Sequence, residues 1–86
     1  MTKIYIYCLF EMGRFQGVYS SLKAIHRDAL RLANRGPSEV IMWDGNTAQQ
    51  PSLTTLRNAL KGRQDVEIKY RTSQTYVTIY KTKLKE

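Results

Sequence analysis

Basic side chains at regular four-residue spacing are the feature of this sequence with the clearest chemical meaning. They belong to a predicted helix over residues 20–37, and they are Lys23, Arg27, Arg31 and Arg35. Residues four apart share one side of a helix, and an arginine guanidinium binds phosphate or carboxylate through two parallel hydrogen bonds. Like charges at this spacing cost a helix about 0.2–0.5 kcal/mol per pair, and only Asp28 lies near enough to offset them. This row, which we call the basic ridge, therefore predicts an anionic partner.

A second predicted helix carries further basic residues, namely Arg57, Lys61 and, just after it, Arg63. If the two helices lie side by side, we expect these residues to extend the basic ridge. The leading hypothesis is a binding module that engages nucleic acid, DNA or RNA, through its backbone phosphates. The alternative is an acidic surface of another protein, because both partners fit the same positive charge.

A predicted hairpin near the end of the chain offers a second surface. Residues 65–72 and 75–83 both alternate, and a two-residue turn at Ser73 and Gln74 would set Arg71 opposite Tyr76. The face so formed carries Lys69, Arg71, Tyr76 and Tyr80. Aromatic rings interleaved with cations on an open sheet form a stacking platform for unpaired bases, which Tyr5 and Tyr7 would enlarge if they point the same way. The competing interpretation is that tyrosines simply suit half-buried strand positions.

Two amphipathic helices and five strands are predicted to hold these surfaces. The first helix buries a stripe that includes Ile25 and Ala29, is capped by Ser20 or Ser21, and stops at Gly36-Pro37. The second opens at Pro51 and Ser52, buries leucines, and stops at Gly62. Strands are expected over 3–10, 14–19 (with a bulge at Gly17), 39–44, 65–72 and 75–83, and residues 47–50 are expected to be loop. The order ββαβαββ predicts an α+β fold, with two helices on one face of a mostly antiparallel sheet.

The first strand is expected to be central and covered on both sides. Its residues divide into one face with Ile4, Ile6, Cys8 and Phe10, and another with Tyr5, Tyr7 and Leu9. Cys8 is then expected to point inward as a small hydrophobe. In the run 39–44, we expect Met42 and Trp43 to be largely buried, or Trp43 to be half-buried at a sheet edge.

Length and charge limit the class of protein. The chain has 14 Lys and Arg against 7 Asp and Glu, so its net charge is +7, and we expect a single domain over residues 1–86. Cys8 and His26 are the only residues of their types, which excludes an internal disulfide and a Cys/His zinc site in a monomer. We therefore expect a cytoplasmic protein that holds no metal. We also expect no cofactor and no membrane segment, because the apolar run at residues 4–10 is too short to cross a membrane. The oligomeric state does not follow from the sequence.

Catalytic machinery is not expected. No phosphate-binding loop or nucleophile motif occurs, so we predict that the protein is not an enzyme. Asp44 precedes Gly45 and Asn46, which predicts a turn-forming carboxylate and not a general base. His26 lies at the rim of the apolar stripe, which predicts a packing residue with one hydrogen bond.

The first half of the chain resembles the GIY-YIG nuclease domain. Lys3-Ile4-Tyr5-Ile6 and then Phe15-Gln16-Gly17 lead into a helix beginning near Ser21. The resemblance covers about 30 residues, but Ile25 stands where that family has its catalytic arginine, so it implies an inactive relative. In size, charge and tyrosine content the chain also resembles the accessory proteins that bacteriophages make to redirect host machinery. That resemblance implies an inhibitor or adaptor acting on a host nucleic-acid-processing or defence enzyme.

Overall fold

Within residues 4–34 and 39–85, the chain forms six strands and two helices. The structure is a computed structural model, and it describes residues 4–34 and 39–85. The elements in chain order are β1 (Tyr5–Glu11), β2 (Arg14–Tyr19), α1 (Leu22–Ala33), β3 (Ile41–Trp43), β4 (Ala48–Gln49), α2 (Leu53–Leu60), β5 (Val66–Arg71) and β6 (Tyr76–Lys83).

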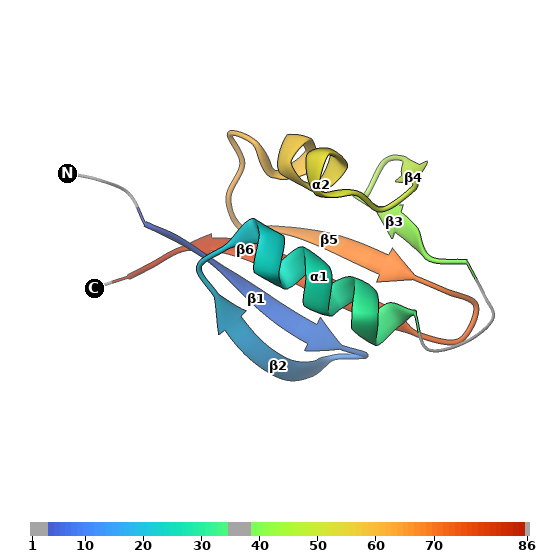
Figure 1. Cartoon of the computed structure of the whole chain (residues 1–86). Helices are drawn as coiled ribbons and strands as arrows, with labels where there is room; N and C mark the ends of the chain where they lie inside the picture. The colour runs from blue at the N-terminus through green and yellow to red at the C-terminus, as the bar shows by residue number, and fades with distance from the viewer. Residues whose placement is uncertain (1–3, 35–38, 86) are drawn as a thin grey trace.

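One antiparallel sheet organises the molecule, with strand order β2-β1-β6-β5-β3-β4. Helix α1 crosses one face of it, and α2 lies beside α1 along the β5 and β3 side (Figure 1). The predicted α+β class and the order ββαβαββ are confirmed. One addition is β4, because Ala48 and Gln49 pair with β3 where the sequence predicted only loop. Two residues are too few to show the alternation by which a strand is recognised.

Serine caps begin both helices. Ser21 accepts a hydrogen bond from the Ala24 amide at 3.2 Å, and Ser52 accepts one from the Thr55 amide at 3.0 Å. The choice between Ser20 and Ser21 is thus settled in favour of Ser21. Helix α2 ends at Leu60, two residues before Gly62, whose φ of +70° suits glycine. The predicted stop of α1 at Gly36-Pro37 lies outside the described residues.

The core lies between the helices and one face of the sheet. Its helical side includes Ile25, Ala29, Leu56 and Leu60, all almost fully buried. The strands contribute Leu9, Met42, Ile68, Tyr70, Val77 and Ile79, none of which is exposed. These strand residues sit directly opposite one another in the sheet, for example Leu9 with Ile79 and Met42 with Tyr70, so they share the helix-covered face.

Strand β1 is central, but helices cover only one of its faces. Tyr5, Tyr7 and Leu9 face the helices, while Cys8 pairs with Tyr80 on the opposite face. The expectation that β1 is covered on both sides is therefore wrong, and so is the inward position of Cys8, which is half-buried on the uncovered side. Tyr5 and Tyr7 consequently do not enlarge the hairpin platform. An apolar run marks a buried strand but does not say how many layers cover it.

A bulge bends β2. Leu9 lies opposite Gly17 and Phe10 lies opposite Phe15, which leaves Gln16 as the extra residue. The bulge predicted from Gly17 is thus confirmed next to that glycine. Because of the extra residue, Phe15 and Val18 both lie on the uncovered side, opposite Phe10 and Cys8.

Candidate nucleic-acid interface

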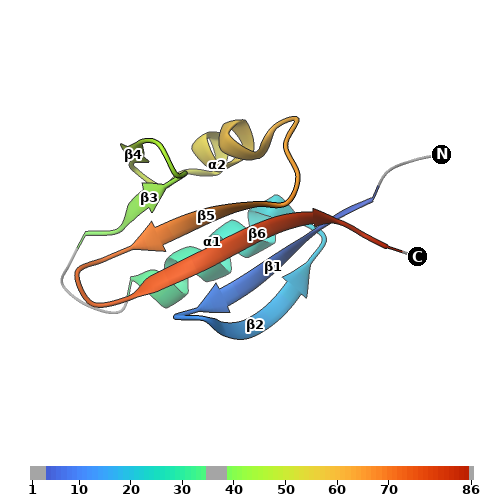
Figure 2. The ribbon, with the colours of Figure 1, turned by 180° about the vertical axis from the view of Figure 1, so that it is seen from behind.

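The sheet face that bears no helix, which we call the open face, collects exposed apolar side chains. Figure 2 shows this face, with α1 lying behind the strands. Phe15 is 60% exposed, Val18 is 56% exposed and Tyr76 is 37% exposed. Phe15 packs edge-to-face on Phe10 with ring centroids 5.7 Å apart. Exposed apolar groups gathered on one face mark a binding surface more often than scattered ones do.

Cations stand between aromatic rings on the β3, β5 and β6 part of the open face. Arg71 lies directly opposite Tyr76, as the hairpin register predicted, and Trp43 lies directly opposite Lys69. The Lys69 ammonium is 5.3 Å from the centre of the Tyr76 ring, within cation–π range. We call Trp43, Lys69, Arg71 and Tyr76 the aromatic–basic cluster.

Trp43 is the member of this cluster that sequence reasoning did not assign to the site. It is half-buried, as one of the two expectations stated, but it does not lie at the sheet edge, because it pairs with Ala48 of β4 as well as with Lys69 of β5. It faces away from the core. Its neighbour Met42 pairs with Tyr70 and is fully buried. Strands β3 and β5 pair with each other although β4 and α2 lie between them in the sequence. A local sequence pattern therefore does not show on which face of the sheet Trp43 lies.

Tyr80, the other predicted stacking residue, is held by its hydroxyl group. The hydroxyl donates to an Asp65 carboxylate oxygen at 2.9 Å, and Thr82 donates to the same oxygen at 2.8 Å. The bonds from Thr82 and Tyr80 lower the pKa of Asp65, and the bond to Asp65 raises the pKa of Tyr80. Tyr80 therefore borders the aromatic–basic cluster as a fixed, half-buried ring.

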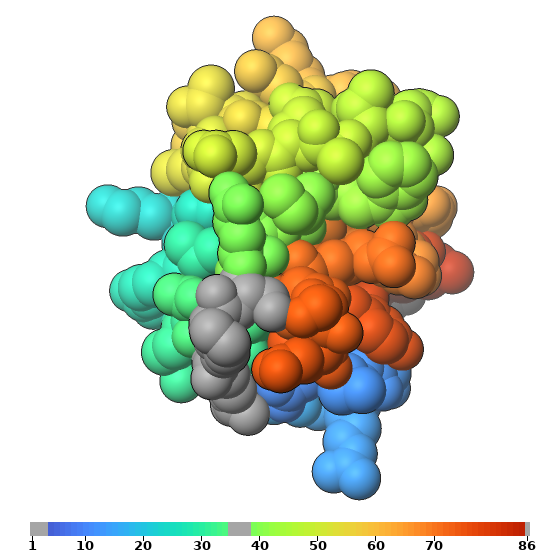
Figure 3. Space-filling model, turned by 90° about the vertical axis from the view of Figure 1, so that its right-hand side faces the viewer, coloured from blue at the N-terminus to red at the C-terminus, as the bar shows by residue number. Residues whose placement is uncertain are grey.

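A hollow of about 260 Å³ opens beside the cluster. Figure 3 views the end of the molecule where the yellow-green β3–β4 segment lies above the orange tip of the β5–β6 hairpin. These two segments line the hollow with Ile41, Trp43, Ala48, Arg71, Thr72 and Ser73, and Glu39 completes it. This hollow could not be predicted from the sequence, because the segments that line it are far apart along the chain.

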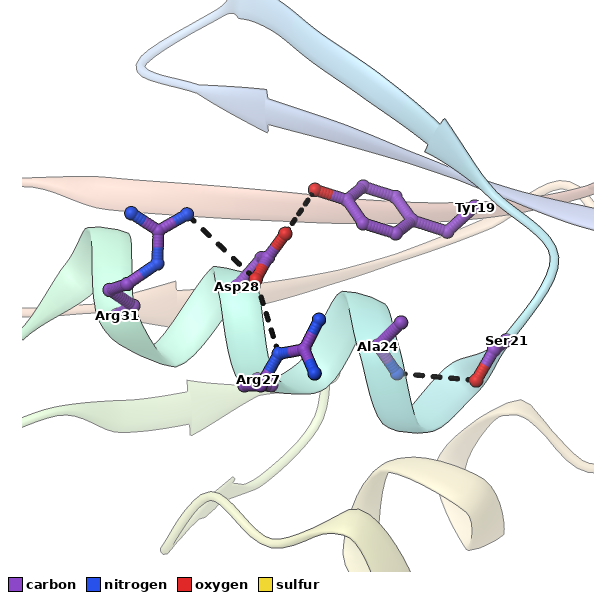
Figure 4. Close-up of polar contacts among 6 residues, drawn as sticks. All are labelled: Tyr19, Ser21, Ala24, Arg27, Asp28 and Arg31. Carbon is purple, nitrogen blue, oxygen red and sulfur yellow. Dashed lines mark hydrogen bonds and ion pairs between the residues drawn. The ribbon is translucent and has the colours of Figure 1, made fainter.

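The described part of the basic ridge lies on the outer side of α1. Lys23 is exposed, and the side chains of Arg27 and Arg31 are 74% and 68% exposed. Both arginines reach Asp28, with Arg27 Nε at 3.4 Å and Arg31 Nη2 at 3.8 Å from Oδ1 (Figure 4). Arg35, the fourth predicted member, lies outside the described residues.

Asp28 is itself anchored to the sheet. The Tyr19 hydroxyl donates to Asp28 Oδ2 at 2.7 Å, which links β2 to α1. This bond lowers the pKa of Asp28 most, and the nearby guanidinium groups of Arg27 and Arg31 lower it further. The carboxylate thus stays ionised and lies within ion-pair distance of both arginines.

The basic residues that follow on α2 are also at the surface. Arg57, Lys61 and Arg63 are all exposed, and Arg63 donates to the Ala59 carbonyl at 3.3 Å. Helices α1 and α2 pack against each other, as the extension of the basic ridge requires. Binding by these residues remains a prediction.

Two other titratable groups have structural roles, as the sequence predicted. Asp44 accepts the amides of Asn46 and Thr47, both at 2.8 Å, so it closes the β3–β4 turn, and these bonds lower its pKa. His26 Nδ1 lies 2.6 Å from the Tyr70 hydroxyl, and burial lowers the pKa of His26. The predicted turn at Asp44 and the predicted hydrogen bond of His26 are thus present in the structure.

Lys81 has a structural role that the sequence did not reveal. It is buried, donates from Nζ to the Leu60 carbonyl at 2.9 Å, and lies 4.6 Å from the Tyr5 ring. An ammonium at the C-terminus of a helix satisfies a free carbonyl there and complements the helix dipole. Lys81 and Tyr5 therefore secure the end of α2.

Comparison of the chain with protein-family models, with curated proteins and with solved structures gives no match. Within residues 4–34 and 39–85, no three His, Cys, Asp or Glu side chains gather in the way a metal site requires. No helix in this part of the chain is long and apolar enough to cross a membrane.

Proposed function

We propose that this protein binds single-stranded nucleic acid on its open face. The observation that carries the proposal is the aromatic–basic cluster, in which Lys69 and Arg71 stand directly opposite Trp43 and Tyr76. Aromatic rings stack on bases of any type, while cations beside them contact the phosphates. A duplex hides its bases, so the rings favour an unpaired strand over double-stranded DNA.

The charge of the molecule supports the same partner. A net charge of +7 draws in a polyanion from a distance, and each phosphate that a cation neutralises releases counterions. Two contacts from Lys69 and Arg71 would give a slope of about −1.4 in the logarithm of affinity against the logarithm of salt concentration. A steeper slope would mean that further basic residues also contact phosphates.

Fluorescence anisotropy with labelled uridine and thymidine oligonucleotides, each about ten nucleotides long, tests the proposal. We expect the wild-type protein to bind at low salt, and Tyr76→Ala to lose about 1–3 kcal/mol of binding free energy. The double variant Lys69→Gln/Arg71→Gln should bind at least tenfold more weakly. The two oligonucleotides separate RNA from DNA preference.

Lys23→Gln/Arg27→Gln is the matched control, because it removes the same charge from the opposite side of the molecule. If this control loses as much affinity as the open-face variant, only overall charge matters and the aromatic–basic cluster is not the site. If the wild-type protein binds neither oligonucleotide, the proposed function is wrong.

The exposed arginines of the basic ridge favour a second candidate function, that of an inhibitor or adaptor that binds an acidic protein surface. Arg27 and Arg31 both lie within ion-pair distance of Asp28 while most of each side chain stays exposed, so each guanidinium can still meet a carboxylate through two parallel hydrogen bonds. Partners captured from a lysate after nuclease digestion, and lost with Arg27→Gln/Arg31→Gln, would support it. Glutamine is preferable to glutamate here, because two new carboxylates beside Asp28 would repel it.

We also propose that the protein is not a catalyst. The residues nearest to the GIY-YIG resemblance have other partners, since Tyr5 lies against Lys81 and Arg27 pairs with Asp28. Highly purified protein should therefore not nick plasmid DNA, with or without divalent metal. Metal-dependent nicking that disappears in Arg27→Ala or Tyr5→Phe would contradict this prediction.

A further inference from the structure

The hollow beside the aromatic–basic cluster combines an apolar wall with two opposite charges. Ile41, Trp43 and Ala48 supply the wall, Arg71 supplies a cation and Glu39 supplies a carboxylate. Its volume of about 260 Å³ lies just under the range of pockets for drug-sized ligands. A single flat group such as one nucleobase fits a hollow of this size.

The charged side chains of Arg71 and Glu39 limit which nucleobase the hollow can bind. Arginine pairs with two neighbouring acceptors, and guanine offers O6 and N7 for this purpose. A carboxylate pairs best with two neighbouring donors, and guanine offers N1–H and its 2-amino group on the next edge. Cytosine offers a carboxylate only one exocyclic amine, while adenine and uracil offer neither two neighbouring acceptors nor two neighbouring donors. Guanine is thus the base that can pair with both side chains through two hydrogen bonds each.

Glu39 is exposed, and among the described residues it has one weak hydrogen-bond contact. The Gln50 amide donates to one of its oxygens at 3.4 Å, which leaves the other lone pairs of the carboxylate able to accept from a ligand. Without such a ligand, a carboxylate on this face would only repel phosphates. Glu39 therefore places a carboxylate acceptor at the wall of the hollow, and a donor group on the base of a nucleotide can bind to it.

We infer that the hollow formed by Glu39, Trp43 and Arg71 binds one unpaired guanine, so that the protein prefers single strands containing guanine. This inference rests on the proposed function. Arg71, which contacts a phosphate when the strand has no guanine, turns to the O6 and N7 side of the base. Glu39 accepts from N1–H and the 2-amino group, and Trp43 stacks on the base.

Affinities for a set of uridine oligonucleotides, each with one central guanosine, cytidine or adenosine or with none, test the inference. We expect the guanosine strand to bind about tenfold more tightly than the all-uridine strand. Glu39→Gln should abolish this preference while it leaves binding of the all-uridine strand intact or slightly stronger. A glutamine cannot accept from two neighbouring donors, since one of its two terminal groups is an amide NH₂, which only donates.

Glu67→Gln is the matched control, because Glu67 is an exposed carboxylate on the same open face, opposite Tyr80 and outside the hollow. It should keep the preference for guanosine. Equal loss in both variants would show that only charge matters, and equal affinity of the wild-type protein for all strands would show that the hollow reads no base. Both results overturn the inference and leave single-strand binding standing. If no strand binds, the proposed function fails and the inference fails with it.

Discussion

Two neighbouring residues of β3 lie on opposite faces of the sheet and have different roles, because successive residues of a strand point to opposite faces. Met42 is fully buried against the helices, whereas Trp43 lies on the open face. Asp28 and Lys81 each connect two elements through one side chain: Asp28 joins α1 to the preceding strand β2, and Lys81 joins β6 to the end of α2. Single residues thus divide between holding the fold and presenting a surface.

Substitution of the two β3 neighbours should separate stability from binding. Met42→Ala removes a buried side chain and should lower the free energy of unfolding by about 2–5 kcal/mol, with little change in oligonucleotide affinity. Trp43→Ala should cost less stability than a fully buried ring would, but should weaken oligonucleotide binding. Urea unfolding and anisotropy measure the two effects. A stability loss for Trp43→Ala larger than that for Met42→Ala would place the indole in the core.

Residue roles could be predicted where the information is local. The opposition of Arg71 and Tyr76 follows from a two-residue turn, and the role of Asp44 follows from the turn sequence after it. The placement of Trp43 against Lys69 and of Glu39 beside Arg71 could not be predicted, because it depends on how β3 joins β5. The hollow is therefore a property of tertiary structure alone.

At the scale of elements, both helices depend on a serine cap at their first turn. Ser21→Ala and Ser52→Ala should each lower the free energy of unfolding by about 1 kcal/mol, because a backbone amide loses its acceptor. Urea unfolding measures this change.

Ser20→Ala is the control for this prediction, because Ser20 is exposed and stands just outside the cap. Its effect should stay within about 0.5 kcal/mol. An effect of Ser20→Ala as large as that of Ser21→Ala would show that the cap is not fixed at one serine.

Element types and order could be predicted because hydrophobic periods of two and of about 3.6 residues differ clearly. The faces of β1 could not, because both of its faces are rich in apolar and aromatic side chains. The open face keeps that apolar character without a second layer, which is what a stacking surface requires. The apolar side chains on the second face of β1 made that face look buried in the sequence. In the proposed function they belong to the surface that contacts the nucleic acid.

At the scale of the whole molecule, stability should fall with acid in two steps. Burial lowers the pKa of His26 from its ordinary value of 6.5, so the unfolded chain takes up that proton first. The stabilisation is full above pH 6.5 and is lost as the pH falls below it. The pKa values of Asp28, Asp44 and Asp65 also lie below their ordinary 3.8, so their contribution is full above pH 3.8 and is lost below it.

Urea unfolding at a series of pH values checks both steps. His26→Gln should reduce the loss of unfolding free energy below pH 6.5, and Asp28→Asn should reduce the loss below pH 3.8. Both effects are changes with pH, so they do not depend on how stable each variant is at neutral pH. An unchanged upper step in His26→Gln would assign that step to another group.

The extra residue Gln16 also governs how two copies of the chain can meet. Strand β2 forms one border of the sheet, and a regular border strand offers its unpaired amides and carbonyls to any other strand. The bulge interrupts that spacing and adds twist, so a second β2 cannot align along its whole length. Phe15 and Val18 can therefore remain exposed for a ligand without making the sheet a template for the edge-to-edge stacking from which fibrils grow.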